Sequence, residues 1–168
     1  QKWLVAFFSS TTPRTAGFST ISLDSLSDSS YLLTLILMFI GGSPASTAGG
    51  IKTTTMAVII MGIYSVFRGK RDIDISNKRI DFSILNQALA IFVSCLLLII
   101  IATLTICAIE PDTTISIKQI TLETVSALGT VGLSMSLTPL LCSASKIILM
   151  LLMFTGRVGI LTLALALL

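Results

Sequence analysis

A five-residue pattern, Thr-x-Gly-x-Ser, occurs twice in this sequence, and its two glycines, Gly17 and Gly132, are 115 residues apart. The same offset places residues 37–39 on residues 152–154, both Leu-Met-Phe, without a gap. A single such pattern is weak, because glycine and serine are frequent in ordinary turns. Two copies in register with a downstream match indicate an internal repeat, so the chain is expected to fold as two related units.

The composition predicts the environment of these units. Hydrophobic residues make up 54% of the chain and charged residues 11%, with a mean hydropathy of +0.98, whereas soluble proteins carry about 25% charged residues. We therefore expect a membrane protein. The net charge of +3 is too small to indicate nucleic-acid binding, and histidine is absent, which argues against zinc chemistry and histidine-based acid–base catalysis. The three cysteines lack metal-like spacing and are expected to pack as small apolar residues.

A glycine-rich stretch interrupts the apolar run of residues 31–67. A continuous helix through this run would measure about 55 Å at a rise of about 1.5 Å per residue, against a hydrocarbon core of about 30 Å. The interruption, residues 41–50, must then lie at membrane depth. Non-helical backbone is tolerated there only where protein buries it or a watery cavity adjoins it. This Gly-rich loop is therefore expected to face a pore.

Charge and segment length predict how the chain crosses the membrane. Residues 68–81 carry five basic side chains, and the positive-inside rule makes this connection cytoplasmic. Residues 85–109 are long enough to cross back, to an acidic turn at residues 110–112. The segments before the two Thr-x-Gly-x-Ser loops, residues 1–12 and 116–128, are too short to span the membrane. Both loops are expected to enter from the outer side.

A short helix followed by an extended Thr-x-Gly-x-Ser loop is suited to binding a cation. Rings of backbone carbonyls replace the lost hydration shell of the ion in potassium filters. Glycine permits the backbone angles this requires, and the helix directs its negative C-terminal end toward the ion. We expect the ion at Gly17 and Gly132, although a pair of ordinary tight turns would leave the same pattern. The filter candidates are Thr15, Ala16, Gly17, Phe18, Thr130, Val131, Gly132 and Leu133.

Three segments resemble the Trk/Ktr/HKT superfamily of potassium transporters. They are Thr-Ala-Gly-Phe-Ser-Thr at residues 15–20, the block at residues 41–55, and Phe-Thr-Gly-Arg-Val-Gly at residues 154–159. Residues 126–134 look closest to KtrB, the membrane subunit of bacterial Ktr systems. The resemblance implies an all-α membrane protein in which four helix–loop–helix repeats of one polypeptide surround a single pore. This chain would supply the third and fourth repeats.

The resemblance divides the chain into two parts. Residues 1–80 would form the third-repeat-like pore helix, filter loop, broken second helix and cytoplasmic linker. Residues 81–168 would form the fourth-repeat-like helix, pore helix, filter loop and a truncated second helix, which descends through Lys146. Ile160 stands where the family pattern has proline, which removes support for a kink there.

The resemblance also assigns a gate to the Gly-rich loop, which obstructs the pore beneath the filter in this superfamily. Arg157 matches an arginine that takes part in the barrier. A charge at membrane depth costs at least about 2.5 kcal/mol, so Arg157 should face the bundle interior with a partner; a structural arginine bonded to helix-end carbonyls is the alternative. Lys52 is expected either to bond loop carbonyls or to reach toward the cytoplasmic interface. The gate candidates are Gly41, Gly42, Ser43, Ala48, Gly49, Gly50, Lys52 and Arg157.

The family further implies partners. These are the missing first half of the same pore, since both ends of this sequence are expected to be cuts in a longer chain, a second pore subunit, the lipid bilayer and a cytoplasmic nucleotide-binding regulatory subunit. Potassium is the implied substrate, and no cofactor is expected on this chain. The resemblance leaves open sodium against potassium selectivity, and coupling to sodium or protons. Localisation in the plasma or bacterial inner membrane follows.

Other functions account for less of the sequence. Gly49-Gly50-Ile51-Lys52-Thr53 superficially resembles a phosphate loop of a nucleotide-binding enzyme, but that motif requires glycine directly before lysine. A non-conducting membrane assembly or interaction subunit would not need two filter-like loops in register. Glu123 falls in the second short helix, where a bond to backbone amides behind the filter is conceivable. The acidic residues Asp24, Asp28, Glu110 and Asp112 are expected to be solvated loop charges rather than a cation-attracting mouth.

Overall fold

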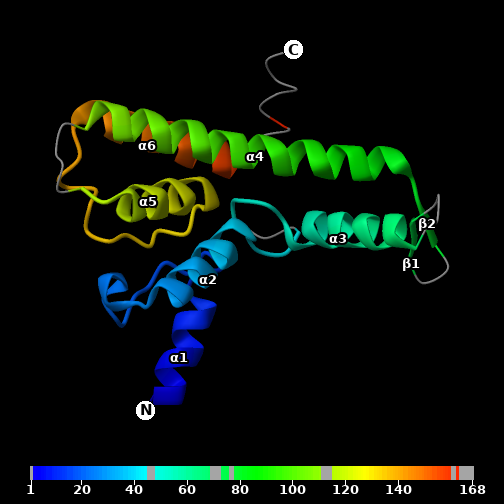
Figure 1. The fold of residues 1–168 in the computed structure, drawn as a ribbon, viewed down its shortest axis with the longest axis horizontal. Helices are drawn as coiled ribbons and strands as arrows, with labels where there is room; N and C mark the ends of the chain where they lie inside the picture. The colour runs from blue at the N-terminus through cyan, green and yellow to red at the C-terminus, as the bar shows by residue number, and fades with distance from the viewer. Residues whose placement is uncertain are drawn as a thin grey trace.

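The computed structural model describes residues 2–44, 48–68, 73–75, 78–110, 115–159 and 162. Helices dominate this part of the chain, and a short hairpin joins its two halves (Figure 1). The elements in chain order are α1 (Lys2–Thr11), the 3-10 helix η1 (Leu23–Ser25), α2 (Asp28–Phe39), α3 (Thr53–Phe67), β1 (Ile73–Ile75), β2 (Lys78–Ile80), α4 (Phe82–Ile109), α5 (Ile117–Gly129) and α6 (Ser143–Val158).

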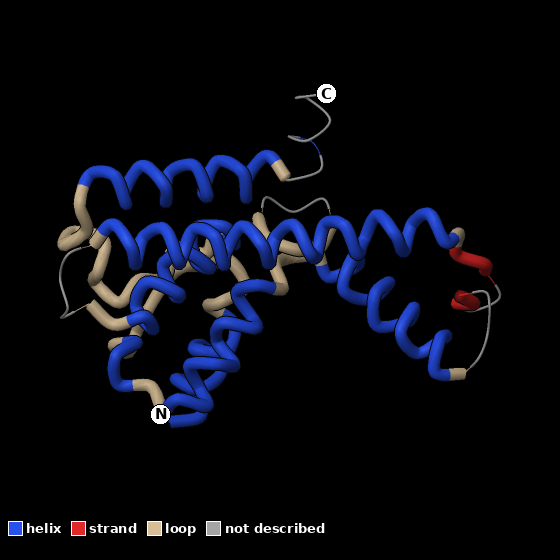
Figure 2. Tube along the Cα trace, turned by 45° about the horizontal axis from the view of Figure 1, so that its top comes forward, coloured by secondary structure: helices blue, strands red, loops and turns tan. Residues whose placement is uncertain are grey.

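The helices pack around α5. Helices α4 and α6 run side by side along one edge of the molecule, and α5 packs against both of them (Figure 1). Helix α2 reaches α5 from the other side, whereas α3 leaves the bundle along α4 and ends at the hairpin, as Figure 2 shows from a second direction. The bundle and the α3 arm therefore share α4 as their common support.

Helix lengths agree with the sequence pattern. Helix α4 has 28 residues with a hydropathy of 2.9 and is, among the described residues, the one helix long and apolar enough to cross a membrane by itself. Helices α2 and α3 are shorter apolar helices, and the predicted break between them lies between Phe39 and Thr53. Helix α6 was expected to run to Leu168. It is described to Val158, and residues 160–161 and 163–168 lie outside the described part.

Helix α5 forms the centre of the core. Every residue from Leu122 to Gly129 is buried. Its start is fixed by a capping box, in which the Ser116 side chain accepts from the backbone of the first turn and the Gln119 side chain accepts from the Ser116 amide. Such burial of a polar-containing helix requires neighbours on all sides, which α4, α6 and α2 provide.

Helix α1, unlike α5, has no buried residue. Its residues are all at least partly exposed, with Trp3 90% exposed and Phe7 71% exposed. The predicted short helix at residues 1–12 is therefore confirmed, ending at Thr11 before Pro13. Trp3, Leu4 and Phe7 form the most exposed apolar part of this helix.

The hairpin corrects the all-α expectation. Strands β1 and β2 pair antiparallel, with Ile73 opposite Ile80 and Ile75 opposite Lys78. The connection at residues 68–81 was predicted only as a charged loop. Its signal was the alternation Ile-Asp-Ile followed by Ser and Asn, residue types that favour a strand and then a turn. Residues 69–72 and 76–77 of this connection lie outside the described part.

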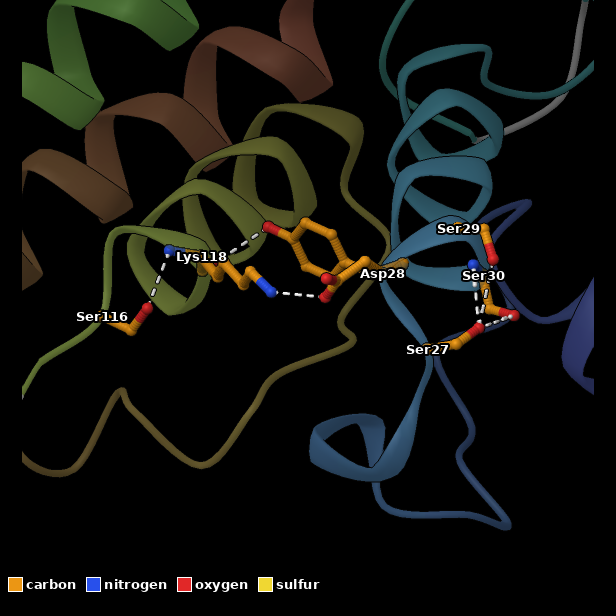
Figure 3. A network of polar contacts seen from close by, with 7 residues as sticks. Ser27, Asp28, Ser29, Ser30, Ser116 and Lys118 are labelled. Atoms are coloured by element: carbon orange, nitrogen blue, oxygen red, sulfur yellow. Dashed lines mark hydrogen bonds and ion pairs between the residues drawn. The ribbon is translucent and has the colours of Figure 1, made fainter.

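Polar contacts tie the helix ends together. Lys118 at the start of α5 pairs with Asp28 at the start of α2 at 2.5 Å, and the Tyr31 hydroxyl donates to the Lys118 carbonyl at 2.7 Å (Figure 3). At the other junction, the Cys142 amide before α6 donates to Glu110 at 2.9 Å. Hydrogen bonds from the Ser145 side chain and from that amide lower the pKa of Glu110. A carboxylate at a helix N-terminus is also favoured by the helix dipole.

Candidate functional site

The two Thr-x-Gly-x-Ser loops have the same backbone pattern. Thr15 and Gly17 have φ values of 67° and 74°, and their counterparts Thr130 and Gly132 have φ values of 53° and 88°. A non-glycine residue with positive φ is uncommon, and for a β-branched residue it is an outlier. Two such threonines at equivalent places indicate that both loops are built to one plan, in which alternate residues are left-handed.

The two loops also contact each other directly. A Cβ atom on Gly17 would overlap the carbonyl oxygen of Val131, and a Cβ atom on Gly132 would lie 3.8 Å from the Cα atom of Gly17. The sequence predicted the two glycines as equivalent positions but gave no information on their separation. The fold brings the two predicted loops together at these glycines.

The loops differ in how they are packed. Phe18 is 70% exposed, whereas its counterpart Leu133 is 4% exposed, and Val131 is also buried. The second loop lies in an apolar cluster with Tyr31 and Met38 of α2 and with Leu122 and Val125 of α5. Helix α5 therefore supports its loop from a buried position, while the first loop follows the exposed helix α1.

A set of polar groups holds the second loop to α5. The Ser126 hydroxyl accepts from the Gly132 amide at 3.2 Å, and Glu123 accepts hydrogen bonds from the hydroxyls of Ser134 and Thr138, the latter at 3.2 Å. Glu123 is only 6% exposed. These residues line a cavity of about 350 Å³ together with Thr130 and Gly132. The partners of Glu123 are thus hydroxyls of the following loop rather than the backbone amides suggested by the sequence.

Replacing Glu123 with alanine is expected to destabilise the protein by about 2 to 3 kcal/mol, because two hydroxyls lose the acceptor that they share. Glu123→Gln keeps one oxygen acceptor and should cost less. The measurement is the midpoint of thermal unfolding of the purified full-length protein. Asp24→Ala, at an exposed position in η1, is the matched control. Equal midpoints for Glu123→Ala and Asp24→Ala would contradict this role.

The Gly-rich loop is closed at its neck and packed against the second loop. The Gly41 amide donates to the Ile51 carbonyl at 2.8 Å, and the Thr53 amide donates to the Gly42 carbonyl at 3.3 Å. Beyond this neck, the Gly49 amide donates to the Thr130 hydroxyl at 2.8 Å. Residues 45–47 lie outside the described part. The Gly-rich loop and the second Thr-x-Gly-x-Ser loop are therefore in direct contact.

Two basic residues were predicted beside this loop. The Lys52 ammonium group donates to the Ala48 carbonyl at 2.5 Å, which is the first of its two expected arrangements. Arg157 lies in the last turn of α6, and its side chain is exposed in this chain. Its predicted position facing the interior of the complete bundle stays a prediction. Its neighbour Gly156 borders the loop, since a Cβ atom on Gly49 would lie 3.0 Å from the Gly156 carbonyl oxygen. The backbone before Arg157 therefore adjoins the Gly-rich loop.

The remaining gate candidates differ in their burial and backbone conformation. Ser43 is exposed, Gly41 and Ala48 are buried, and Gly50 has a left-handed φ of 68° with Gly129 close by. Sequence reasoning quoted Ser126 and Ser134 within motifs but gave neither a role, and it missed the pairing of Gly49 with Thr130. No local pattern identifies such partners, because each bond depends on how the loops fold back on α5.

Solved structures place this arrangement in a known fold. The crystal structure of the potassium transporter TrkH from Vibrio parahaemolyticus matches with a TM-score of 0.79 at 20% sequence identity, covering 98% of this chain and 36% of that one. The chain thus shares the fold of the matched part of that structure. The 28-residue apolar helix and the composition agree with a membrane location.

Sequence comparison gives the family. The TrkH family, described as cation transport protein, matches residues 1–168, and the chain belongs to this family. Ktr system potassium uptake protein B of Bacillus subtilis (strain 168) is 41% identical over 162 residues, which are 96% of this chain and 36% of that protein. Potassium/sodium uptake protein NtpJ of Enterococcus hirae is 40% identical over 164 residues, with the same coverage. The chain spans 36% of the length of these relatives.

Proposed function

We propose that this chain forms two adjacent quarters of a potassium-conducting pore, with Thr15 to Phe18 and Thr130 to Leu133 as filter segments and the ion bound at Gly17 and Gly132. The observation that carries the proposal is the shared left-handed pattern of the two loops together with their contact at Gly17 and Val131. Left-handed positions such as those of the two glycines let a loop turn its carbonyl groups toward one side, and rings of backbone carbonyls form potassium filters.

The Gly-rich loop is the proposed gate. Its closed neck and its contacts with Thr130, Gly129 and Gly156 support a position next to the inner end of the second filter segment. The bond from Lys52 to Ala48 supports a role for Lys52 in holding the loop. Arg157 follows Gly156 directly and would complete the barrier.

Family membership supports a proposal for the rest of the pore. We propose that residues 1–80 and 81–168 act as third and fourth repeats, that two further repeats complete the ring, and that the exposed apolar face of α1 packs against protein or lipid. A second pore subunit and a cytoplasmic nucleotide-binding subunit are the proposed partners. Residues 68–81 would face the cytoplasm and both filter loops the outside, with sodium or proton coupling as a further option.

The test is potassium uptake by the full-length protein that contains this chain, in cells deprived of their own potassium uptake systems. Uptake at low external potassium is expected, and Gly132→Ser should weaken it by about five- to thirtyfold, because a side chain at a left-handed position costs about 1 to 2 kcal/mol. Sodium uptake is measured in parallel to detect a change of selectivity.

Two outcomes would contradict the proposal. A Gly132→Ser protein with wild-type uptake and selectivity would remove Gly132 from the filter. Full expression without any uptake, with the regulatory subunit present, would favour the non-conducting assembly subunit instead.

A further inference from the structure

In the described part of the loop, a hydrogen bond to one side chain joins the Gly-rich loop to the second filter segment. The Gly49 amide donates to the Thr130 hydroxyl at 2.8 Å, although the two residues are 81 positions apart in the chain. A Cβ atom on Gly49 would lie 2.6 Å from both the Oγ1 and the Cγ2 atoms of Thr130. The backbone of the loop thus lies directly on the threonine side chain, and a residue larger than glycine does not fit at position 49.

Thr130 is an unusual residue for its position. It is the C-cap of α5 and has a left-handed conformation, φ 53° and ψ 38°, which glycine or asparagine adopts more readily than a β-branched residue. Within the described residues, the hydroxyl of Thr130 accepts from the Gly-rich loop, which neither glycine nor valine could do in the same way. The hydroxyl supplies a physical reason for a threonine at this strained position.

The neck of the loop is held independently of Thr130. The bonds from Gly41 to Ile51 and from Thr53 to Gly42 join the end of α2 to the start of α3. Lys52 adds a bond to the Ala48 carbonyl. Loss of the Thr130 hydroxyl would therefore free the part of the loop around Gly49 and leave the neck and both helices in place.

We propose that the Thr130 hydroxyl is the latch that holds the Gly-rich loop against the second filter segment, and so couples the filter to the gate. Thr130 is a positioning residue in this role, because it acts through the loop. The inference rests on the proposed function, since opening of the Gly-rich loop is measured as potassium flux through the pore. When the hydroxyl no longer accepts the Gly49 amide, the loop leaves the filter more often and conduction increases.

The test compares variants of the full-length protein in vesicles, with potassium influx measured without the activating subunit. Thr130→Val removes the acceptor at nearly constant shape and leaves the buried Gly49 amide unpaired, so influx should rise at least about fivefold. Thr130→Ser keeps an acceptor and should give less than half of that increase. Thr121→Val is the matched control: it lies in the same helix, and its hydroxyl bonds the Ile117 carbonyl of its own turn. Its influx should equal that of the wild type.

A second readout follows the loop itself. Ser43 is an exposed residue of the loop, and Ser43→Cys should react faster with a thiol reagent when Thr130→Val is also present, after subtraction of the labelling of the native cysteines. Equal labelling rates would overturn the latch. If the wild-type protein conducts potassium, an influx in Thr130→Val at or below the wild-type value would also overturn it. A wild-type protein that conducts no potassium while its loop labelling still depends on Thr130 would overturn the proposed function and retain the latch.

Discussion

Replacing Gly17 with alanine is expected to abolish potassium uptake, whereas Gly132→Ala should only reduce it. Both glycines have positive φ, so each alanine incurs a conformational cost of about 1 to 2 kcal/mol. The surroundings differ. A Cβ atom on Gly17 would overlap the carbonyl oxygen of Val131, while the nearest atom to a Cβ on Gly132 is the Gly17 Cα at 3.8 Å. Only the first substitution forces the two loops apart.

The difference in uptake between Gly17→Ala and Gly132→Ala follows from the rigidity of the backbone. The atom that Gly17→Ala would meet belongs to the main chain and cannot move aside as a side chain would, and overpacking of this kind costs about 1 to 3 kcal/mol beyond the strain. Uptake by Gly17→Ala should therefore be at least about fivefold below that of Gly132→Ala. The measurement is the initial rate of potassium uptake at matched amounts of protein in the membrane. If Gly132→Ala were the more damaging of the two, the contact between the loops would be wrong.

Replacing Gly156 with alanine is expected to cost about 3 kcal/mol or more and to prevent recovery of much folded protein. A Cβ atom on Gly156 would overlap the Leu128 carbonyl oxygen and lie 2.9 Å from its carbon atom, because α6 crosses α5 with the two backbones in contact. Helix α5 is buried there and cannot retreat. The expected result is a lower midpoint of thermal unfolding, or a folded yield too small to measure one.

Gly62→Ala provides the matched comparison. Gly62 and Gly156 both lie inside helices, so both alanines gain the same intrinsic helix preference of about 1 kcal/mol. The atom nearest to a Cβ on Gly62 is the Cδ1 of Leu85 at 2.6 Å, which is the flexible end of a side chain. The midpoint of Gly62→Ala should therefore stay close to that of the wild type. Similar losses for the two variants would show that the crossing of α5 and α6 is not the close contact described.

Much of the fold could be predicted because the signals are local. The break after Phe39, the long helix ending at Ile109 and the short helix before Thr130 all follow from runs of apolar residues and their interruption by glycine, proline and capping groups. The hairpin at residues 73–80 was missed because a few alternating residues within a charged connection resemble a loop. The gate and filter residues were identified by type, and their roles remain predictions.

The sequence by itself determined the membrane character, the two related loops with glycine at equivalent positions and the broken helix between them, since hydropathy and spacing are properties of the chain read in order. Only the tertiary structure decided that Gly17 lies against Val131, that the Thr130 hydroxyl holds Gly49, that Glu123 bonds Ser134 and Thr138, and that Leu133 is buried while Phe18 is exposed. The physical reason is that these contacts join segments far apart in the chain. Their geometry depends on how α5 is enclosed by its neighbours, and no residue pattern along the chain encodes that packing.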